Sequence, residues 1–190
     1  MSDAGDLTTL DDVKNYMSET SSNADAALAL LITAESGFVK RYCDDPFLQN
    51  SYDFIESGWG GRMMPLPYGP VSSVTSVMVN NQNIPARSLP SRDGFSFNSK
   101  DQCVRLSGYT FCHGQNNVEI FYTAGYATID DLPGDLRFAV TKLVVHRFRE
   151  RTRTGKGNES IGGKQTASYN DSMPSDVQVT LDRYRRRSIG

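Results

Sequence analysis

Apolar residues follow a clear helical period between residues 133 and 154. Pro133 suits the first turn of a helix, because its ring fixes φ and its missing N–H would have no intrahelical partner there. The apolar residues beyond it recur at spacings that place them on one helical face. They are Leu136, Ala139, Val140, Leu143, Val144 and Phe148. The pattern predicts a long helix with one buried face, which Gly155 and Gly157 should end.

Two further helical patterns lie near the amino terminus. Thr9 and Asp12 approximate a capping box, which predicts a short helix through Met17. Asn23 can cap a longer second helix, which should end near Pro46, because a proline disfavours helical geometry in the residue before it. The predicted apolar side of this second helix carries Ala27, Leu28, Leu31, Ala34, Phe38 and Tyr42.

The period changes between residues 51 and 126. β-branched and aromatic residues predict short strands near 52–56, 62–67, 71–79, 95–97, 104–106 and 118–122. Val74 breaks the alternation of apolar residues in the predicted strand at 71–79. Residues 80–83 are typical of a turn. A small β domain is therefore expected between the helices.

Residues 154–174 are polar and show no period beyond a possible strand-like fragment at 166–169. Such a stretch has too little apolar surface to order itself, so we expect an arm that becomes ordered against a partner. Ser175 or Asp176 should cap a last helix with a narrow apolar stripe.

These patterns predict an α+β chain. Residues 1–50 form an amino-terminal helical segment, and residues 51–126 form an inserted small β domain. Residues 127–154 hold the long helix from Pro133 that completes the helical core. Residues 155–190 form an extended carboxyl-terminal arm ending in a short basic helix.

The net charge of −2 conceals an asymmetry along the chain. Residues 1–136 hold 8 Lys/Arg against 17 Asp/Glu, whereas residues 137–190 hold 12 against 5, which gives net charges of −9 and +7. Such a chain can pair with copies of itself or present its basic end to an acidic protein or to nucleic acid. The alternative is that these charges simply lie on solvent-exposed surfaces whose net charges differ in sign and that they bind no partner.

The sequence lacks the motifs of several functional classes. No stretch approaches the roughly 20 apolar residues that span a bilayer, and residues 1–10 are acidic and polar, so we expect neither a membrane segment nor a signal peptide. The three cysteines, Cys43, Cys103 and Cys112, have no paired spacing and suggest reduced, packed thiols.

Catalytic and cofactor signals are equally weak. The stretch from residue 157 resembles a phosphate-binding loop, but Gly163 stands where that motif needs Lys. The two histidines, His113 and His146, have no cluster of metal ligands near them in sequence, and no nucleophile elbow surrounds any serine. We therefore expect no enzyme activity, no cofactor and no metal.

The order of several segments along the chain resembles the order in a known protein family. FYTAGY at 121–126 is followed by an acidic loop, by Leu132 and Pro133, by a helix ending in Arg and Glu, and by ESIGG at 159–163. Together with residues 7–14 and the tail at 174–187, this order resembles the head-to-tail connector (adaptor) proteins of tailed bacteriophages. The β insertion departs from the smaller, all-helical members.

The resemblance implies a structural virion protein without catalytic activity. About a dozen copies would form a ring beneath the portal protein at the neck of the virion, after assembly in the host cytoplasm. The far face would receive a tail-side connector, stopper or tail protein, genomic DNA would pass through the bore, and no membrane would be involved.

Basic residues are the candidate interaction sites. The terminal helix would bind the portal through Val177, Leu181, Arg183, Tyr184, Arg185, Arg186 and Arg187. A second group, Arg147, Arg149, Arg151 and Arg153, would form an inter-subunit or basic surface. Because Lys and Arg also neutralise phosphates, the alternative function is a DNA-binding accessory protein of phage packaging. Arginine equally suits protein interfaces, through bidentate pairing with carboxylates.

Overall fold

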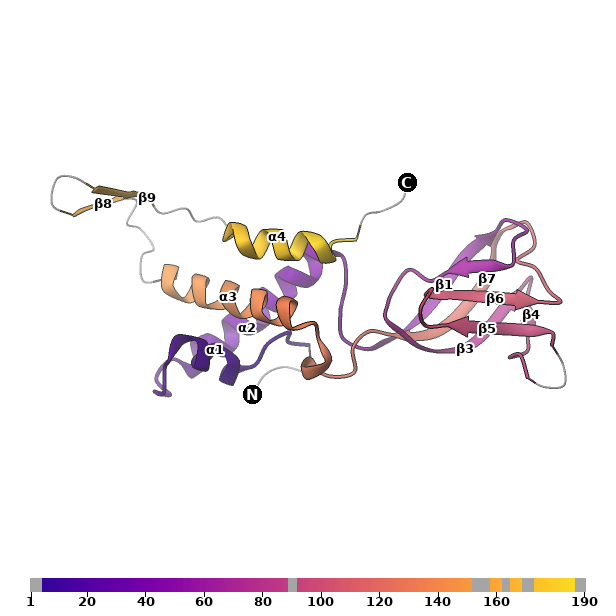
Figure 1. Ribbon diagram of the computed structural model, residues 1–190, viewed down its shortest axis with the longest axis horizontal. Coiled ribbons are helices and arrows are strands. Elements are labelled where there is room, and N and C mark those ends of the chain that lie inside the picture. Colours follow the sequence, from indigo (N-terminus) through magenta and orange to yellow (C-terminus); the bar gives the residue numbers. More distant parts are fainter. Residues whose placement is uncertain (1–4, 89–91, 152–157, 162–164, 169–172, 187–190) are drawn as a thin grey trace. The chain divides into compact units, whose positions relative to one another are not determined.

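The computed structural model describes residues 5–88, 92–151, 158–161, 165–168 and 173–186 (Figure 1). These residues form four α-helices and antiparallel strands, so the predicted α+β class is confirmed. The chain divides into two compact units. One unit holds residues 1–45 and 129–190 and contains the helices, and the other holds residues 46–128 and contains two sheets.

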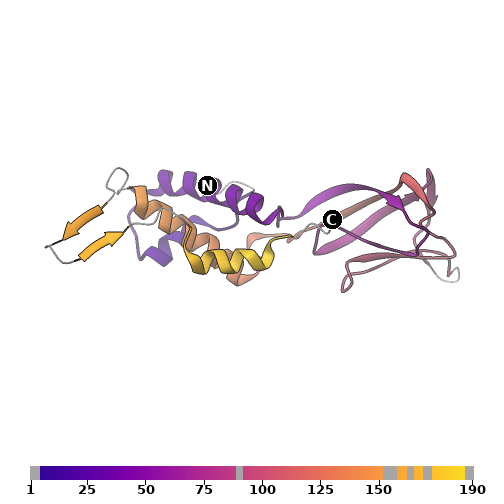
Figure 2. The ribbon, with the colours of Figure 1, turned by 90° about the horizontal axis from the view of Figure 1, so that it is seen from above.

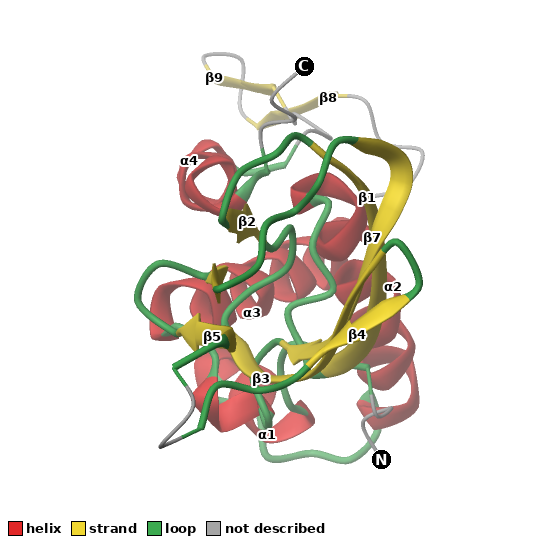
Figure 3. Cartoon of the chain, turned by 90° about the vertical axis from the view of Figure 1, so that its right-hand side faces the viewer, coloured by secondary structure: helices red, strands yellow, loops and turns green. Residues whose placement is uncertain are grey.

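The helical unit contains α1 (Leu10–Met17), α2 (Asp25–Cys43), α3 (Gly134–Glu150) and α4 (Ser175–Tyr184), with a short 3-10 turn, η1 (Ile129–Asp131), before α3. α2 and α3 pack together and run in opposite directions (Figures 1 and 2). α1 packs on both of them from one side and α4 from another, as the end-on view shows (Figure 3).

The start of α1 confirms the predicted capping box. The Asp12 N–H donates to Thr9 Oγ1 at 3.1 Å, and the Thr9 N–H donates to the Asp12 carboxylate at 3.3 Å. Each side chain thereby satisfies an N–H group that has no partner within the helix. The helix ends at Met17, as expected.

α2 corrects two expectations. Asn23 does not cap the helix, because a turn in which the Asp25 N–H donates to the Ser22 carbonyl delays the first helical residue, and Ala24 becomes the N-cap. The predicted apolar side is also wrong in part, since Ala34 is exposed. The buried side carries Leu28, Ile32, Ser36, Val39 and Cys43.

The reason lies in the neighbours of α2. Leu28 and Ile32 pack with Val13 of α1 and with Val144 and Val145 of α3, so tertiary contacts choose the buried face. α2 also carries apolar residues on its outer side, and sequence alone could not separate the two faces.

α3 follows its sequence pattern closely. Pro133 is the N-cap, and its carbonyl accepts from the Arg137 N–H at 3.0 Å. The predicted stripe is buried from Leu136 to Val144, while Phe148 is half-buried. The helix ends at Glu150, earlier than predicted, and Gly155 and Gly157 lie outside the described residues.

The second unit contains two antiparallel sheets. One has the order β1-β7-β3-β4 and the other has the order β2-β6-β5. The strands are β1 (Asn50–Gly58), β2 (Met63–Pro65), β3 (Val71–Val79), β4 (Gln82–Ile84), β5 (Gly94–Asn98), β6 (Cys103–Ser107) and β7 (Gly114–Ala124). Buried side chains from both sheets form one core.

Two local features refine the strand predictions. Register shifts between Val71 and Ser73 and between Val74 and Ser76 put Val74 out of step with a simple alternation. Asn80 and Asn81, with φ of 51° and 61°, form a two-residue hairpin loop between paired Val79 and Gln82. The predicted turn cluster therefore ends at Asn81, and β4 begins directly after it.

The ends of the sheet unit meet. Asn50 of β1 pairs with Ala124 of β7, and Leu48 forms a bridge with Tyr126 just before and after these strands. Gly125 (φ +105°) allows this approach, because a Cβ atom there would lie 2.5 Å from the Leu48 carbonyl oxygen. The chain thus enters and leaves this unit at neighbouring points.

The polar arm is more regular than expected. β8 (Asn158–Ile161) and β9 (Gln165–Ser168) pair in antiparallel register, from Asn158 with Ser168 to Ile161 with Gln165. The expectation that this stretch lacks order of its own is therefore wrong for the hairpin, because a backbone ladder needs no apolar periodicity.

The thiols are packed at two of the three positions. Cys43 and Cys103 are buried and Cys112 is exposed, and none of the three forms a disulfide. Burial, followed by the nearby Asp45 carboxylate, raises the pKa of the Cys43 thiol to about 11. Cys43 therefore stays protonated at neutral pH. No helix in the described part of the chain is long and apolar enough to cross a bilayer.

Candidate interaction surfaces

The terminal helix packs on its own chain. Val177 and Leu181 are 1% and 0% exposed, because α4 lies against α2 and α3. The predicted need for a portal protein to cover this stripe is thus corrected, since long-range packing within the chain supplies the cover. Pro174 is the N-cap and no side chain caps α4, so the predicted capping by Ser175 or Asp176 is also wrong.

Polar contacts hold the same helix in place. The Tyr42 hydroxyl donates to Asp182 at 2.6 Å, and the Tyr184 hydroxyl donates to Asp135 at 2.5 Å. Lys142 of α3 forms an ion pair with Asp176. These contacts join α4 to both α2 and α3, so α4 is part of the helical unit.

The arginines at the end of α4 differ in their surroundings. Arg183 is exposed, and Arg185 is exposed with its guanidinium 5.4 Å from the centroid of the Tyr42 ring. Arg186 pairs with the half-buried Asp45 at 2.9 Å. Arg187 lies outside the described residues. Arg183 and Arg185 can therefore meet a partner, whereas Arg186 stabilises the fold.

The described arginines of the predicted basic surface, Arg147, Arg149 and Arg151, differ in their surroundings. Arg147 faces Glu35 of α2 at 3.6 Å, and the Arg151 guanidinium lies 4.2 Å from the Phe148 ring centroid. Arg149 is exposed, and Arg153 lies outside the described residues. Burial raises the pKa of Glu35, although Arg147 opposes the shift.

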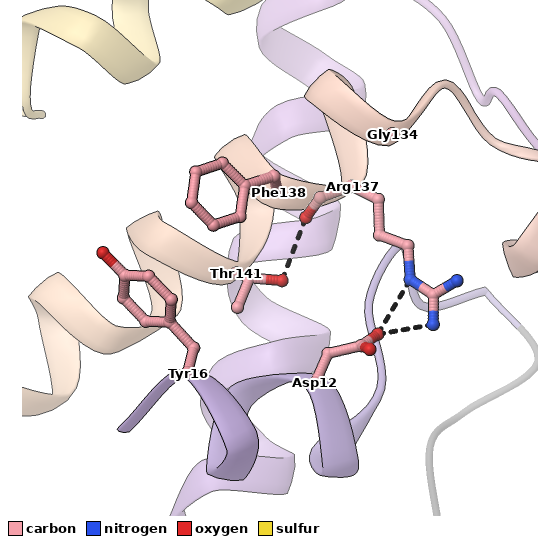
Figure 4. Close-up of a pocket in the computed structure, with 6 residues that line it drawn as sticks. All are labelled: Asp12, Tyr16, Gly134, Arg137, Phe138 and Thr141. Atoms are coloured by element: carbon pink, nitrogen blue, oxygen red, sulfur yellow. Dashed lines mark hydrogen bonds and ion pairs between the residues drawn. The ribbon is translucent and has the colours of Figure 1, made fainter. Parts of the chain in front are cut away.

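A groove lies between α1 and α3, and no pattern in the sequence predicted it. We call it the Tyr16–Phe138 groove, and its volume is about 360 Å³ (Figure 4). Its two rings meet edge to face with centroids 5.5 Å apart, and they are 42% and 49% exposed. Its lining residues are Asp12, Tyr16, Gly134, Arg137, Phe138 and Thr141.

An ion-pair cluster forms the polar end of this groove. Arg137 donates from Nε to Asp12 at 2.8 Å and from Nη1 to Asp130 at 2.6 Å (Figure 4 shows the Asp12 contact). Thr141 donates to the Arg137 carbonyl at 3.0 Å and lies 2.7 Å from the Thr8 hydroxyl. The groove wall is thereby fixed before any partner binds.

The pKa of the Asp12 carboxyl is shifted by its contacts in this cluster. Burial raises its pKa, but hydrogen bonds from Thr9 and Arg137 outweigh burial and hold the pKa below the ordinary value of 3.8. A carboxyl whose pKa is lowered by folding stabilises the folded state above that ordinary value and loses this contribution as the pH falls further.

We expect Asp12→Asn to lower the free energy of unfolding by about 1 kcal/mol at pH 7, because one charged partner of a partly exposed Arg137 is lost. The difference from the wild type should shrink below pH 3.8, as the wild-type carboxyl becomes protonated. Urea unfolding at a series of pH values measures both effects. A difference that stays constant down to pH 2 would contradict the assignment.

A second cavity of about 420 Å³ lies farther along α3. His146 and Arg149 line it together with Tyr16 and Pro174, and His146 Nδ1 is buried without a hydrogen-bond partner. Among the described residues, no group of three or more His, Cys, Asp or Glu side chains is arranged to hold a metal ion. Cys112 and His113 are both exposed.

The chain shares its fold with chains from the neck of gene transfer agent particles. A chain from the neck of an empty gene transfer agent particle, computed with C6 symmetry, matches with a TM-score of 0.56 and 18% identity over 95% of this chain and 91% of that chain. A chain from the native neck with C12 symmetry matches with a TM-score of 0.57 and 20% identity, over 95% and 90% of the two chains.

A chain from the virion of the native gene transfer agent particle gives the same TM-score and identity over 100% of this chain and 95% of that chain. The sequence model of the head completion protein family matches residues 6–187, so the chain belongs to the head completion protein family. The resemblance to head-to-tail connector proteins is therefore confirmed. No curated protein matches the chain in sequence.

Proposed function

We propose that this structural neck protein is the subunit of a ring, of about a dozen copies, that lies beneath the portal and joins the DNA-filled head to the tail. The observation that carries the proposal is the family match across residues 6–187. Neck structures solved with C6 and C12 symmetry support a cyclic arrangement. The helical unit would form the body of the ring, with the sheet unit as an insertion, and DNA would pass through the bore.

The portal contact is proposed for the arm and the end of α4. Arg185 is exposed, and the chain leaves the helix there in an extended conformation, with φ −66° and ψ 123°. Arginine at this place can form bidentate pairs with acidic groups of a portal subunit. Val177, Leu181 and Tyr184 would contribute indirectly, by fixing α4. The opposite face of the ring would receive a tail-side connector, stopper or tail protein.

Electron microscopy of purified particles tests this function. Particles carrying a tagged copy of the chain should show the tag as a ring between the portal and the tail, and particles lacking the chain should be filled heads without tails. Tailed particles assembled without the chain, or a tag located elsewhere in the virion, would contradict the proposal.

The DNA-binding alternative makes a different prediction. Four cations of the helical unit, Arg137, Lys142, Arg147 and Arg186, already face carboxylates of the same chain. We therefore expect weak duplex binding by the isolated subunit at physiological salt and a shallow dependence of log K on log salt concentration, because few phosphates are neutralised. Fluorescence anisotropy with labelled duplex measures this. Nanomolar binding, with a slope of log K against log salt concentration that corresponds to the release of several ions, would favour the role as a packaging accessory protein.

A further inference from the structure

The helical unit has a second apolar surface, which lies on another side of the unit from the Tyr16–Phe138 groove. On α2, the residues that point away from the buried side are Ala26, Leu30, Ala34, Gly37 and Arg41. We call this surface the outer α2 face. Leu30 is 73% exposed, the highest value among the large apolar side chains that the structure describes as exposed. A helix that is apolar on both sides is typically covered on both sides, and the described residues of this chain cover only one side of α2.

The two surfaces face in different directions. Phe138 lies on the side of α3 away from the buried residues Leu136, Ala139 and Val140, just as Leu30 lies on the side of α2 away from its own buried residues. Because α2 and α3 pack against each other, their outer sides look away from one another (Figure 3). One chain therefore cannot bring its own Leu30 to its own groove.

This placement suits a ring. A closed ring of identical copies needs two different, complementary patches on each copy, one for each neighbour. We propose that the outer α2 face of one copy packs into the Tyr16–Phe138 groove of the next. The proposal rests on the ring function proposed above and names the surfaces that join its subunits.

The shapes of the two surfaces are compatible. Ala26, Ala34 and Gly37 leave the flank of α2 shallow, so a neighbouring helix can approach closely while Leu30 projects. The groove of about 360 Å³ offers two aromatic rings to receive an apolar side chain, above a wall held by Arg137 and Thr141. Aromatic side chains in such positions commonly anchor interfaces.

The charges are also complementary. Two carboxylates, Asp12 and Asp130, face the single cation Arg137 at the end of the groove where α3 begins. Arg41 lies exposed in the last turn of α2, and α2 ends where α3 begins, because the two helices are antiparallel. Neighbours in a ring keep nearly the same orientation, so Arg41 of one copy would lie beside the acidic end of the next groove.

A symmetric contact between two grooves fits less well. It would place the acidic ends of both copies at one interface, where like charges repel. It would also leave the outer α2 face without a partner. The pairing of different surfaces explains both features together.

Engineered disulfides test the pairing. Cys112→Ser removes the exposed thiol, and Leu30→Cys with Phe138→Cys places one new thiol on each surface. In purified particles under mild oxidation, the chain with both new cysteines should give covalent dimers, trimers and longer species on a gel without reductant. Each single cysteine variant should remain monomeric, whereas a symmetric contact would give dimers with one cysteine alone.

Charged substitutions supply an independent readout. Leu30→Asp should lower the amount of chain in purified particles at least tenfold, while Leu30→Met should retain it. Val179→Asp is the matched control, because Val179 is 57% exposed on the outer side of α4 and lies on neither surface. Thermal unfolding should show that Leu30→Asp and Val179→Asp subunits remain folded.

The outcomes separate the two proposals. If wild-type particles lack the chain at the neck, the ring function fails. If the chain is in the neck, but the double cysteine variant gives no multimers or only dimers that either single variant also gives, the ring function stands and this pairing is overturned.

Discussion

Leu181→Ala should lower the free energy of unfolding of the helical unit by about 2–5 kcal/mol, the range for a large-to-small change in a packed core. Leu181 is fully buried where α4 packs on α2 and α3, so the shorter side chain leaves a cavity between α4 and the rest of the unit. Urea denaturation followed by helical circular dichroism measures the effect. Removing residues 173–190 should be still more damaging, because the buried Val177, three polar contacts of α4 and the Arg186–Asp45 ion pair are lost with it.

Val179→Ala on the same helix is the control. Its side chain is exposed, and we expect a change within about 0.5 kcal/mol, as for most surface substitutions. Two protein concentrations should be compared, because assembly would add stability that depends on concentration. Equal effects of Leu181→Ala and Val179→Ala would mean that α4 is not packed on the helical unit.

Arg185→Glu should reduce the attachment of the subunit to portal-bearing heads by at least about tenfold, without a measurable loss of stability. Arg185 is exposed at the end of α4, so a charge reversal there leaves the core intact. A loss of 1.4 kcal/mol at each contact is a factor of ten in affinity, and repetition around a ring multiplies the effect on avidity. Co-sedimentation of purified subunits with heads, and counts of filled heads without tails, measure it.

Arg186→Glu is the contrasting variant. Arg186 pairs with Asp45, whose side chain is 13% exposed, so a second carboxylate there would put like charges together. We expect this variant to unfold more easily than Arg185→Glu. Normal attachment by a folded Arg185→Glu subunit would move the portal contact away from the end of α4.

Local signals in the sequence predicted most of the secondary structure. The Thr9–Asp12 capping box and Pro133 define helix starts through contacts within a few residues, and both were predictable for that reason. The strands were predictable from alternation, although the β3 bulges were visible only as the misplaced Val74. Asn23 failed as a cap because a preceding turn, which composition does not reveal, moved the helix start.

Long-range packing decided what sequence could not. The stripe of Val177 and Leu181 was correctly identified, but its partner was taken to be another protein because no sequence feature shows that α4 returns to α2 and α3. The groove was missed because Phe138 falls outside the apolar period of α3 and Tyr16 lies in a different helix. A large aromatic residue on the polar side of an amphipathic helix was the available signal.

The adjacent ends of the sheet unit have an evolutionary consequence. Leu48 and Tyr126 form a bridge within the sheet unit, so the chain enters and leaves this unit at neighbouring points. A short glycine and serine linker could join these two points with little entropic cost, and the helices would keep their packing. A unit whose ends are adjacent can be gained or lost in evolution as one segment, because the chain on either side of it keeps its path.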